Sequence, residues 1–300
     1  MTRHIRLREY DPNLEVKARP TDEYLATCDQ SLQDKEYIFR TDENGFIRTG
    51  LSDNHVDSRL ILHLGDSVVE NYWVEEHDRS SAALERYLRN NGVHASVLNA
   101  GKTGTTTVQS LNYLINKCMN LSLSGVIITT SIMDDMVYYD NGSLWVEIVE
   151  HNSSFTQTRY PRPKVELDDR IRALGLLHAI CQECSLPFWV TTWGFDARAP
   201  CCAGLKLSGD AARQWLDRMT QANEATRQFA KLRGCGLIDL AQCLCGRDEL
   251  FYDGLHPNAL GCAAVGEATG KILVEHFRPK TTSFSHTFRR VFNRLVHKKE

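Results

Sequence analysis

The sequence predicts an α/β protein with a five-stranded parallel sheet. Short apolar or β-branched runs alternate with helical stretches of ten or more residues, and turn residues separate the two. Such alternation is typical of βαβ units, whose right-handed crossovers place helices on both faces of the sheet. The chain has 300 residues, 42% of them hydrophobic, which suffices for one sizeable core.

The five predicted strands are short runs rich in Leu, Ile and Val. They are Leu60–Leu64, His94–Leu98, Gly125–Thr130, Phe188–Thr192 and Gly236–Leu240. The predicted helices have apolar residues at helical spacing. They are Glu75–Asn91, Thr105–Cys118, Leu167–Cys184, Ser208–Arg233 and Asn258–Phe277. We therefore expect residues 59–277 to form one α/β domain.

Two segments lie outside this alternating region. Residues 1–58 are polar and irregular, and we expect an N-terminal arm with short strands or turns at Tyr37–Arg40 and Gly45–Arg48. Residues 278–300 form a basic extension in which apolar residues share one face at helical spacing. Such a helix either packs on its own domain or makes a weak contact with an anionic membrane surface.

Bulk properties exclude several classes of function. The formal charge of −3 and the pI of about 6.4 predict no nucleic-acid partner. No apolar run approaches the ~20 residues that a membrane-spanning helix needs. The first residues, MTRHIRLREYDPN, lack the apolar segment of a secretory signal, so we expect a cytoplasmic protein.

The ten cysteines are expected to be reduced thiols in a large chain without an export signal. Cys181–Cys184 and Cys243–Cys245 invite comparison with a zinc site, but buried free cysteines also pack well as small hydrophobic side chains. We favour packing, because Cys181 and Cys184 lie in an apolar helical stretch without a second C-x-x-C pair at zinc-knuckle spacing. The sequence therefore predicts no metal.

Residues that can carry chemistry follow the strands at their carboxyl ends, where ligands bind in parallel α/β sheets. Gly65-Asp66-Ser67 ends the first strand, Asn99 to Gly104 follows the second, and Asp253-Gly254-Leu255-His256 precedes the last helix. A serine hydroxyl needs an adjacent base, and the base needs an orienting partner. The sequence therefore predicts Ser67 as nucleophile, His256 as its base and Asp253 as the orienting carboxylate.

These motifs resemble the conserved blocks of the SGNH/GDSL hydrolases. Gly65-Asp66-Ser67 is similar to the first block, with Val68 where the family has Leu, and Asn99 with Gly104 is similar to the second. Asp253–His256 is similar to the D-x-x-H block. The resemblance spans about residues 59–277 and implies a flavodoxin-like three-layer α/β/α fold and an ester hydrolase without a cofactor. It also implies an oxyanion hole made of the backbone N–H groups of Ser67 and Gly104 and an Asn side chain.

The family's third block, G-x-N-D, is altered in this chain. The matching run is Ile132 to Asp135, so Asp134 stands where the Asn would donate a hydrogen bond to the oxyanion. An ionised carboxylate only accepts hydrogen bonds. Asp134 could be protonated and still donate, it could point away from the oxyanion, or the protein could be a weakened enzyme or a binding protein on this scaffold. We expect retained hydrolysis, because the three residues of the triad are all present.

The expected substrate is a small molecule, either a saccharide ester or a lipid ester. The family acts on esters of lipids, sugars and acyl thiols, and the run from Leu64 to Trp145 resembles a bacterial branch found among polysaccharide-related enzymes. Tyr138 follows the third strand and Trp193 the fourth, so we predict that both contact the substrate. If a sugar hydroxyl competes with water, the same site is an acyltransferase with a saccharide acceptor.

Overall fold

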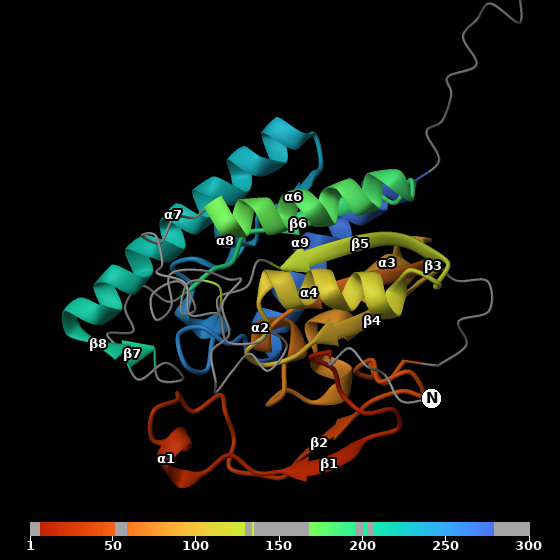
Figure 1. Cartoon of the computed structure of the whole chain (residues 1–300). Helices are drawn as coiled ribbons and strands as arrows, with labels where there is room; N and C mark the ends of the chain where they lie inside the picture. The colour runs from red at the N-terminus through yellow and green to blue at the C-terminus, as the bar shows by residue number, and fades with distance from the viewer. Residues whose placement is uncertain are drawn as a thin grey trace, which may run out of the picture.

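A five-stranded parallel sheet forms the centre of the molecule (Figure 1). The computed structural model describes residues 7–51, 59–129, 134, 168–195, 201–202 and 207–278. The strand order is β4–β3–β5–β6–β9, which is flavodoxin-like, and all neighbouring pairs are parallel. The strands are β3 (Arg59–Gly65), β4 (Ala95–Gly101), β5 (Leu123–Thr129), β6 (Phe188–Thr191) and β9 (Gly236–Ile238). This confirms the predicted α/β class and the five parallel strands.

Alternate side chains of each strand enter two separate hydrophobic cores, as the period of two requires. On β3, Ile61 belongs to one core and Leu62 to the other. The first core includes residues of α3 (Ser80–Asn90) and α9 (Ala259–Phe277). The second includes residues of α4 (Thr107–Tyr113) and α6 (Asp168–Glu183). The long helix α7 (Gly209–Arg233) contributes to both, so the sheet lies between two helical layers.

Several element boundaries differ from those predicted. The predicted helix Glu75–Asn91 is divided into a 3-10 turn, η1 (Glu76–Asp78), and α3. The helix predicted at Thr105–Cys118 continues from α4 into a π-helical turn, η2 (Leu114–Cys118). Some short elements are not predicted, because they have too few residues to show a period. They are α2 (Ser67–Glu70), α8 (Leu240–Leu244), η4 (Asp248–Leu250), and the paired strands β7 (Cys201–Cys202) and β8 (Leu207–Ser208).

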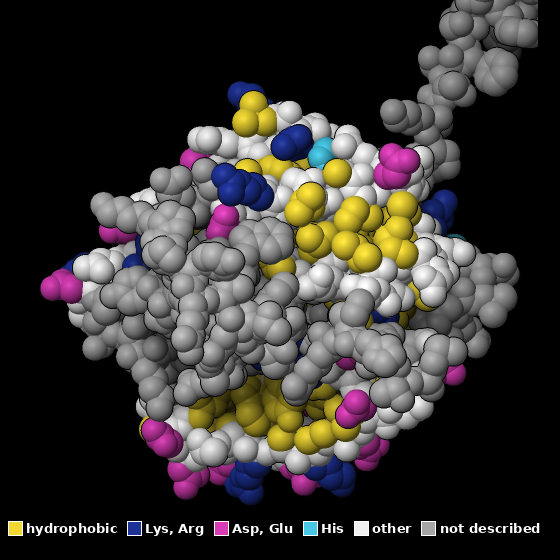
Figure 2. Space-filling view, in the orientation of Figure 1, with side chains coloured by type: hydrophobic (Ala, Val, Ile, Leu, Met, Phe, Trp, Pro, Cys, Tyr) yellow, Lys and Arg dark blue, Asp and Glu magenta, His cyan; other side chains and the backbone are white. Residues whose placement is uncertain are grey.

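The N-terminal arm lies against the edge of the sheet. Its strand β1 (Glu15–Ala18) pairs antiparallel with β2 (Tyr37–Arg40), and α1 (Asp22–Leu25) lies between them in sequence. The predicted strand at Tyr37–Arg40 is thus confirmed, whereas Gly45–Arg48 contains isolated bridges from Ile47 to Thr41 and to Asn99 of β4. Hydrophobic side chains gather above β1 and α1 in Figure 2, where the arm meets the rest of the molecule. The arm is therefore packed on the sheet domain through apolar contacts.

Some predictions concern residues that the structure does not describe. The predicted substrate residue Tyr138 and the basic extension beyond residue 278 lie outside the described ranges. Of the helices in the described residues, none has both the length and the apolar character needed to cross a membrane.

Candidate active site

Ser67, His256 and Asp253 form a continuous chain of hydrogen bonds. The distance from Ser67 Oγ to His256 Nε2 is 2.8 Å, and that from His256 Nδ1 to Asp253 Oδ2 is 2.6 Å. A carboxylate only accepts, so Nδ1 carries the proton that binds Asp253 and Nε2 is left to accept the Ser67 hydroxyl. This tautomer is the one in which an imidazole withdraws a proton from a serine hydroxyl.

The turn between β3 and α2 presents Ser67 at a helix N-terminus. Asp66 is the N-cap of α2, and its Oδ1 accepts a hydrogen bond from the Val68 N–H at 3.2 Å. The turn is also tightly packed, because a Cβ on Gly101 would lie 2.4 Å from the Glu70 nitrogen. Asp66 therefore fixes the turn, and Gly101 lets β4 approach the backbone of α2 closely.

Charges around His256 favour the protonated imidazole. Burial opposes a charged ring, but the nearby carboxyl groups of Asp253, Asp66 and Glu70 outweigh it, and the pKa of His256 is raised. Burial also opposes ionisation of Asp253. The His256 charge and the hydrogen bonds from the His256 ring and from the His256 and Leu255 N–H groups nevertheless lower the pKa of Asp253. The pair thus suits a base that gains a proton during reaction and an acid that stays ionised beside it.

The predicted oxyanion residue Gly104 lies in a turn after β4. Its φ of +75° is in the left-handed region that favours glycine. The Thr105 N–H donates to the Lys102 carbonyl at 3.0 Å and closes the turn. Asn99, the other residue of this motif, instead holds the sheet to α2, because its Nδ2 donates to the Val69 carbonyl at 2.9 Å. The roles of the Ser67 and Gly104 N–H groups towards an oxyanion remain predictions.

Asp134 is fully buried and engaged with α4 and α6. Its Oδ1 accepts the Thr107 N–H at 2.8 Å, and its Oδ2 lies 2.5 Å from Thr107 Oγ1. Arg170 Nε lies 3.5 Å from the same Oδ2. Burial raises the pKa of Asp134 to about 6, although Arg170 and Thr107 oppose the shift. These contacts with Thr107 agree with the alternative in which Asp134 points away from the oxyanion, and a donor role for Asp134 stays a prediction.

Trp193 lies in the core beneath the site. Its side chain is 1% exposed, and its Nε1 donates to the Leu255 carbonyl at 3.2 Å, in the loop that carries His256. Its backbone N–H and carbonyl both bind the Asn223 side chain of α7, at 3.0 and 2.8 Å. Trp193 therefore braces the His256 loop, and the predicted contact with substrate is untested.

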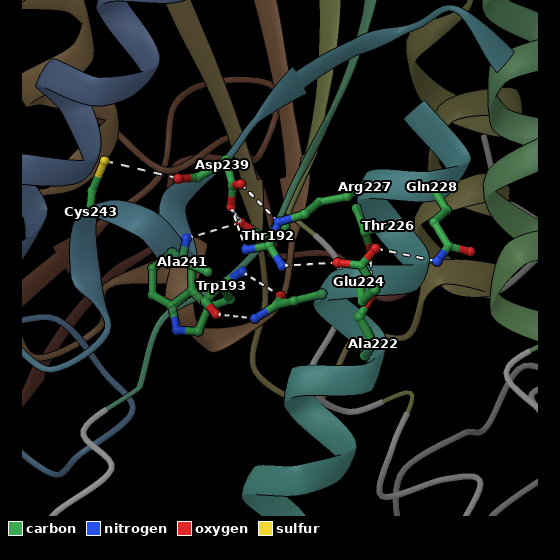
Figure 3. A network of polar contacts seen from close by, with 11 residues as sticks. Thr192, Trp193, Ala222, Glu224, Thr226, Arg227, Gln228, Asp239, Ala241 and Cys243 are labelled. Atoms are coloured by element: carbon green, nitrogen blue, oxygen red, sulfur yellow. Dashed lines mark hydrogen bonds and ion pairs between the residues drawn. The ribbon is translucent and has the colours of Figure 1, made fainter. Parts of the chain in front are cut away.

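A partly buried polar network fixes the strand ends next to Trp193 (Figure 3). The Thr192 hydroxyl donates to Asp239 at 2.6 Å, and the Arg227 guanidinium binds both oxygens of the same carboxylate at 2.8 and 2.9 Å. The Ala241 N–H donates to Thr192 Oγ1 at 2.9 Å. Because these residues belong to the ends of β6 and β9 and to α7 and α8, the network keeps this edge of the sheet rigid.

The sequence did not predict the part that the N-terminal arm takes in the site. Glu70, three residues after Ser67, is buried and accepts hydrogen bonds from the Tyr10 hydroxyl and from the Thr103 N–H, the latter at 3.0 Å. Arg8 binds the Thr103 carbonyl, and Tyr24 binds Asp253. No local pattern in the polar arm signals these contacts, because each joins segments far apart in sequence.

The cysteine pairs do not gather into a cluster. Cys181 is buried in the second core, whereas Cys184 and Cys245 are exposed. In the described part of the chain, no group of three or more His, Cys, Asp or Glu residues is arranged to hold a metal ion.

Comparisons with known proteins identify related families and folds. The model of the GDSL-like Lipase/Acylhydrolase family matches residues 63–264. No curated protein sequence matches the chain. The solved structures with similar folds include an acetyl xylan esterase, AlAXEase, with a TM-score of 0.52 and 13% identity, covering 71% of this chain and 98% of that one.

Two further solved structures are similar over nearly their whole lengths. The lipase/acylhydrolase from Enterococcus faecalis has a TM-score of 0.52 and 19% identity, covering 74% of this chain and 98% of its own. The psychrotrophic esterase EstA from Pseudoalteromonas sp., inhibited by monoethylphosphonate, has a TM-score of 0.51 and 14% identity, covering 73% and 98%. At these identities the structures show a shared fold and no more.

Proposed function

The chain belongs to the GDSL-like lipase/acylhydrolase family and is a hydrolase acting on esters, and we propose that it cleaves its substrate through a triad of Ser67, His256 and Asp253. The observation that carries the proposal is the chain of two hydrogen bonds, 2.8 and 2.6 Å long, that links the three side chains. These bonds support the proposal, because a serine nucleophile needs an adjacent base and the base needs an orienting partner.

The reaction proceeds in two halves. Ser67 Oγ attacks the ester carbonyl carbon while His256 Nε2 takes the hydroxyl proton, and Asp253 stabilises the imidazolium that forms. His256 then gives this proton to the leaving alcohol, and the acyl group stays on Ser67. A water molecule attacks the acyl-enzyme with the same base, and the carboxylic acid and free Ser67 are regenerated.

The negative charge that develops on the carbonyl oxygen is stabilised by backbone donors. We assign these donors to the Ser67 N–H, at the start of α2, and the Gly104 N–H, in the turn after β4. A helix N-terminus favours negative charge, which supports the first of them. Asp134 is engaged with Thr107 and Arg170, so the proposal relies on the two backbone N–H groups, and a contribution from Asp134 requires a protonated carboxyl.

We propose a carbohydrate or lipid ester as the substrate. The support is the sequence prediction, together with the fold shared with an acetyl xylan esterase and a lipase/acylhydrolase. A panel of p-nitrophenyl esters of increasing acyl length, with acetylated sugars, separates the two classes by their kcat/KM values.

Labelling with a fluorophosphonate tests the triad, because only an activated serine reacts. The variants are Ser67→Ala and, as a matched control, Ser122→Ala at an exposed serine before β5. We expect the wild type and Ser122→Ala to be labelled and to hydrolyse esters, and Ser67→Ala to lose both properties, with activity reduced by about 10⁴-fold or more. Labelling or hydrolysis that persists in Ser67→Ala would show that another residue is the nucleophile.

A further inference from the structure

The N-terminal arm reaches the predicted catalytic carboxylate directly. The Tyr24 hydroxyl, in α1, donates to Asp253 Oδ2 at 2.9 Å across 229 residues of sequence. The same oxygen accepts the His256 Nδ1–H at 2.6 Å. The other oxygen, Oδ1, accepts the N–H groups of Leu255 at 3.1 Å and His256 at 2.7 Å. Among the described residues, each oxygen of Asp253 therefore accepts two hydrogen bonds, and one of the four comes from the arm.

Contacts other than that of Tyr24 also hold the arm on the loop that carries Asp253 and His256. The Asp29 N–H donates to the Tyr252 carbonyl at 2.8 Å, and Asn258 Nδ2 donates to Ser31 Oγ at 3.1 Å. Tyr252 also packs in one hydrophobic cluster with residues of the arm, and its ring stacks on that of His256 at 5.7 Å. These contacts fix α1 next to the loop, so Tyr24 meets Asp253 in a defined geometry.

A phenol that donates to a carboxylate has two effects on the imidazole beyond it. It stops the carboxyl group of Asp253 from rotating away from His256 Nδ1. It also spreads the negative charge of Asp253, which weakens the attraction between that charge and a protonated ring. The first effect helps catalysis at every pH. The second lowers the pKa of His256, so that the imidazole stays neutral down to a lower pH.

In the part of the chain that the structure describes, the titratable groups that face Asp253 and His256 come from the arm, the loop that carries them, and the segment that carries Ser67. Tyr24 and Cys28 belong to the arm, Tyr252 to the loop, and Asp66 and Glu70 to the turn and helix that carry Ser67. Burial and the Asp253 charge raise the pKa of Tyr24, so the phenol keeps its proton and remains a donor. Burial raises the pKa of Cys28 to about 11, so this thiol is neutral as well. Tyr24 therefore acts as a neutral donor rather than as a charge.

We propose that Tyr24 is a positioning residue of the active site, which orients Asp253 and sets the pH range in which His256 acts as a base. The inference rests on the proposed function of Ser67, Asp253 and His256. Under this proposal the N-terminal arm contributes a residue to the active site, although the family match begins only at residue 63.

The test is the pH dependence of fluorophosphonate labelling in the full-length chain with Tyr24→Phe. Without the phenol, Asp253 attracts the imidazolium more strongly, the pKa of His256 rises, and the acidic limb of the profile moves to higher pH. We expect a shift of about half a pH unit and a plateau rate about three- to tenfold lower, the scale of one hydrogen bond to a charged group.

Tyr37→Phe is the matched control. Tyr37 is in the same hydrophobic cluster, and among the described residues its hydroxyl bonds to the Gln33 backbone, at 3.2 and 3.4 Å, rather than to the loop. This variant should keep the wild-type midpoint and rate. A limb that stays in place in Tyr24→Phe, or that moves equally in both variants, overturns the proposal.

Substitution by 3-fluorotyrosine at position 24 keeps the test valid if Tyr24→Phe folds poorly. The fluorinated phenol is a stronger donor of nearly the same size, so we expect the limb to move to lower pH, opposite to the change in Tyr24→Phe. A purely structural role for Tyr24 predicts the wild-type midpoint. Ser67→Ala separates this proposal from the proposed function, since labelling of Ser67→Ala contradicts the triad, whatever the Tyr24 variants show.

Discussion

Arg8 donates two hydrogen bonds to the carbonyl oxygen of Thr103, from Nε at 3.0 Å and from Nη2 at 2.5 Å. That oxygen belongs to the peptide unit whose N–H is the Gly104 donor of the proposed oxyanion hole. A cation at a carbonyl oxygen draws electron density from the amide nitrogen and makes its N–H a stronger donor. The arm therefore contacts the turn that carries Gly104 as well as Asp253.

Replacing this guanidinium should lower turnover without abolishing it. We expect Arg8→Gln to reduce kcat by about tenfold, less than the ~10²–10³ that follows loss of a complete oxyanion donor. KM should change little, because the hydrogen bond from the Gly104 N–H strengthens only as negative charge develops on the carbonyl oxygen of the substrate. Arg19→Gln is the control, since Arg19 is exposed and pairs with Asp34 elsewhere in the arm. A wild-type kcat in Arg8→Gln would contradict this prediction.

The rate of hydrolysis should fall on the acidic side of neutrality. His256 acts as a base only when it is neutral, and its pKa is raised above the ordinary 6.5 by the surrounding carboxyl groups. The rate therefore climbs as pH rises through this elevated pKa and levels off above it. The kcat/KM profile of the free enzyme between pH 4 and 9 measures the limb. A midpoint below 6.5, or a flat profile, would show that the charges of Asp253, Asp66 and Glu70 do not dominate.

Asp134 should make stability depend on pH in a defined direction. Its pKa is raised from 3.8 to about 6 in the folded state, so the folded protein holds this proton more tightly than the unfolded chain does. Its contribution to stability is complete below about pH 4 and is lost as pH rises through 6, a change of roughly 3 kcal/mol.

The Asp134→Asn variant measures that contribution, because an amide stays neutral throughout. We expect the melting temperature of Asp134→Asn to rise relative to wild type between pH 4 and pH 7. Melting curves of both proteins at each pH give the difference. A constant difference would mean that Arg170, 3.5 Å from the carboxylate, compensates the cost of burying the charge in full.

A methyl group at Gly101 should disturb the helix that carries Ser67. The new Cβ would lie 2.4 Å from the Glu70 nitrogen and 2.7 Å from the Val69 carbonyl carbon, both of them backbone atoms of α2. We expect Gly101→Ala to cost about 2–3 kcal/mol of unfolding free energy. Gly175→Ala in α6 is the control, since the nearest described atom there is Arg233 Nη2 at 3.6 Å. Denaturant titration compares the two variants, and equal stability would refute the close approach.

The sheet could be predicted from the sequence because its signals are local. Each strand is a short apolar run, and the core residues Ile61 and Leu62 alternate between its two faces. The motif residues could also be predicted, because Ser67 and His256 follow recognisable turns at the carboxyl edge. Short elements such as α2 could not, since four residues show no period.

The supporting contacts of the site could not be predicted, because they depend on tertiary packing. The sequence identifies Asp134 as unusual but gives no sign that Arg170 and Thr107 surround it. Tyr24 belongs to a four-residue helix in a polar segment, and its partner is 229 residues away. The motif residues are therefore visible in the sequence, whereas their buried partners become apparent only when the chain is folded.

The proposed active centre joins segments that lie far apart in the chain. Its hydrogen bonds close loops of 189 residues between Ser67 and His256 and of 229 residues between Tyr24 and Asp253. Closing such long loops costs entropy that nearer contacts, such as those between β3 and β4, do not require. We therefore expect a refolding chain to regain its circular dichroism before its activity, because the site needs these distant segments to be in place. Enzymatic activity is thus a stricter report of the native state than secondary structure.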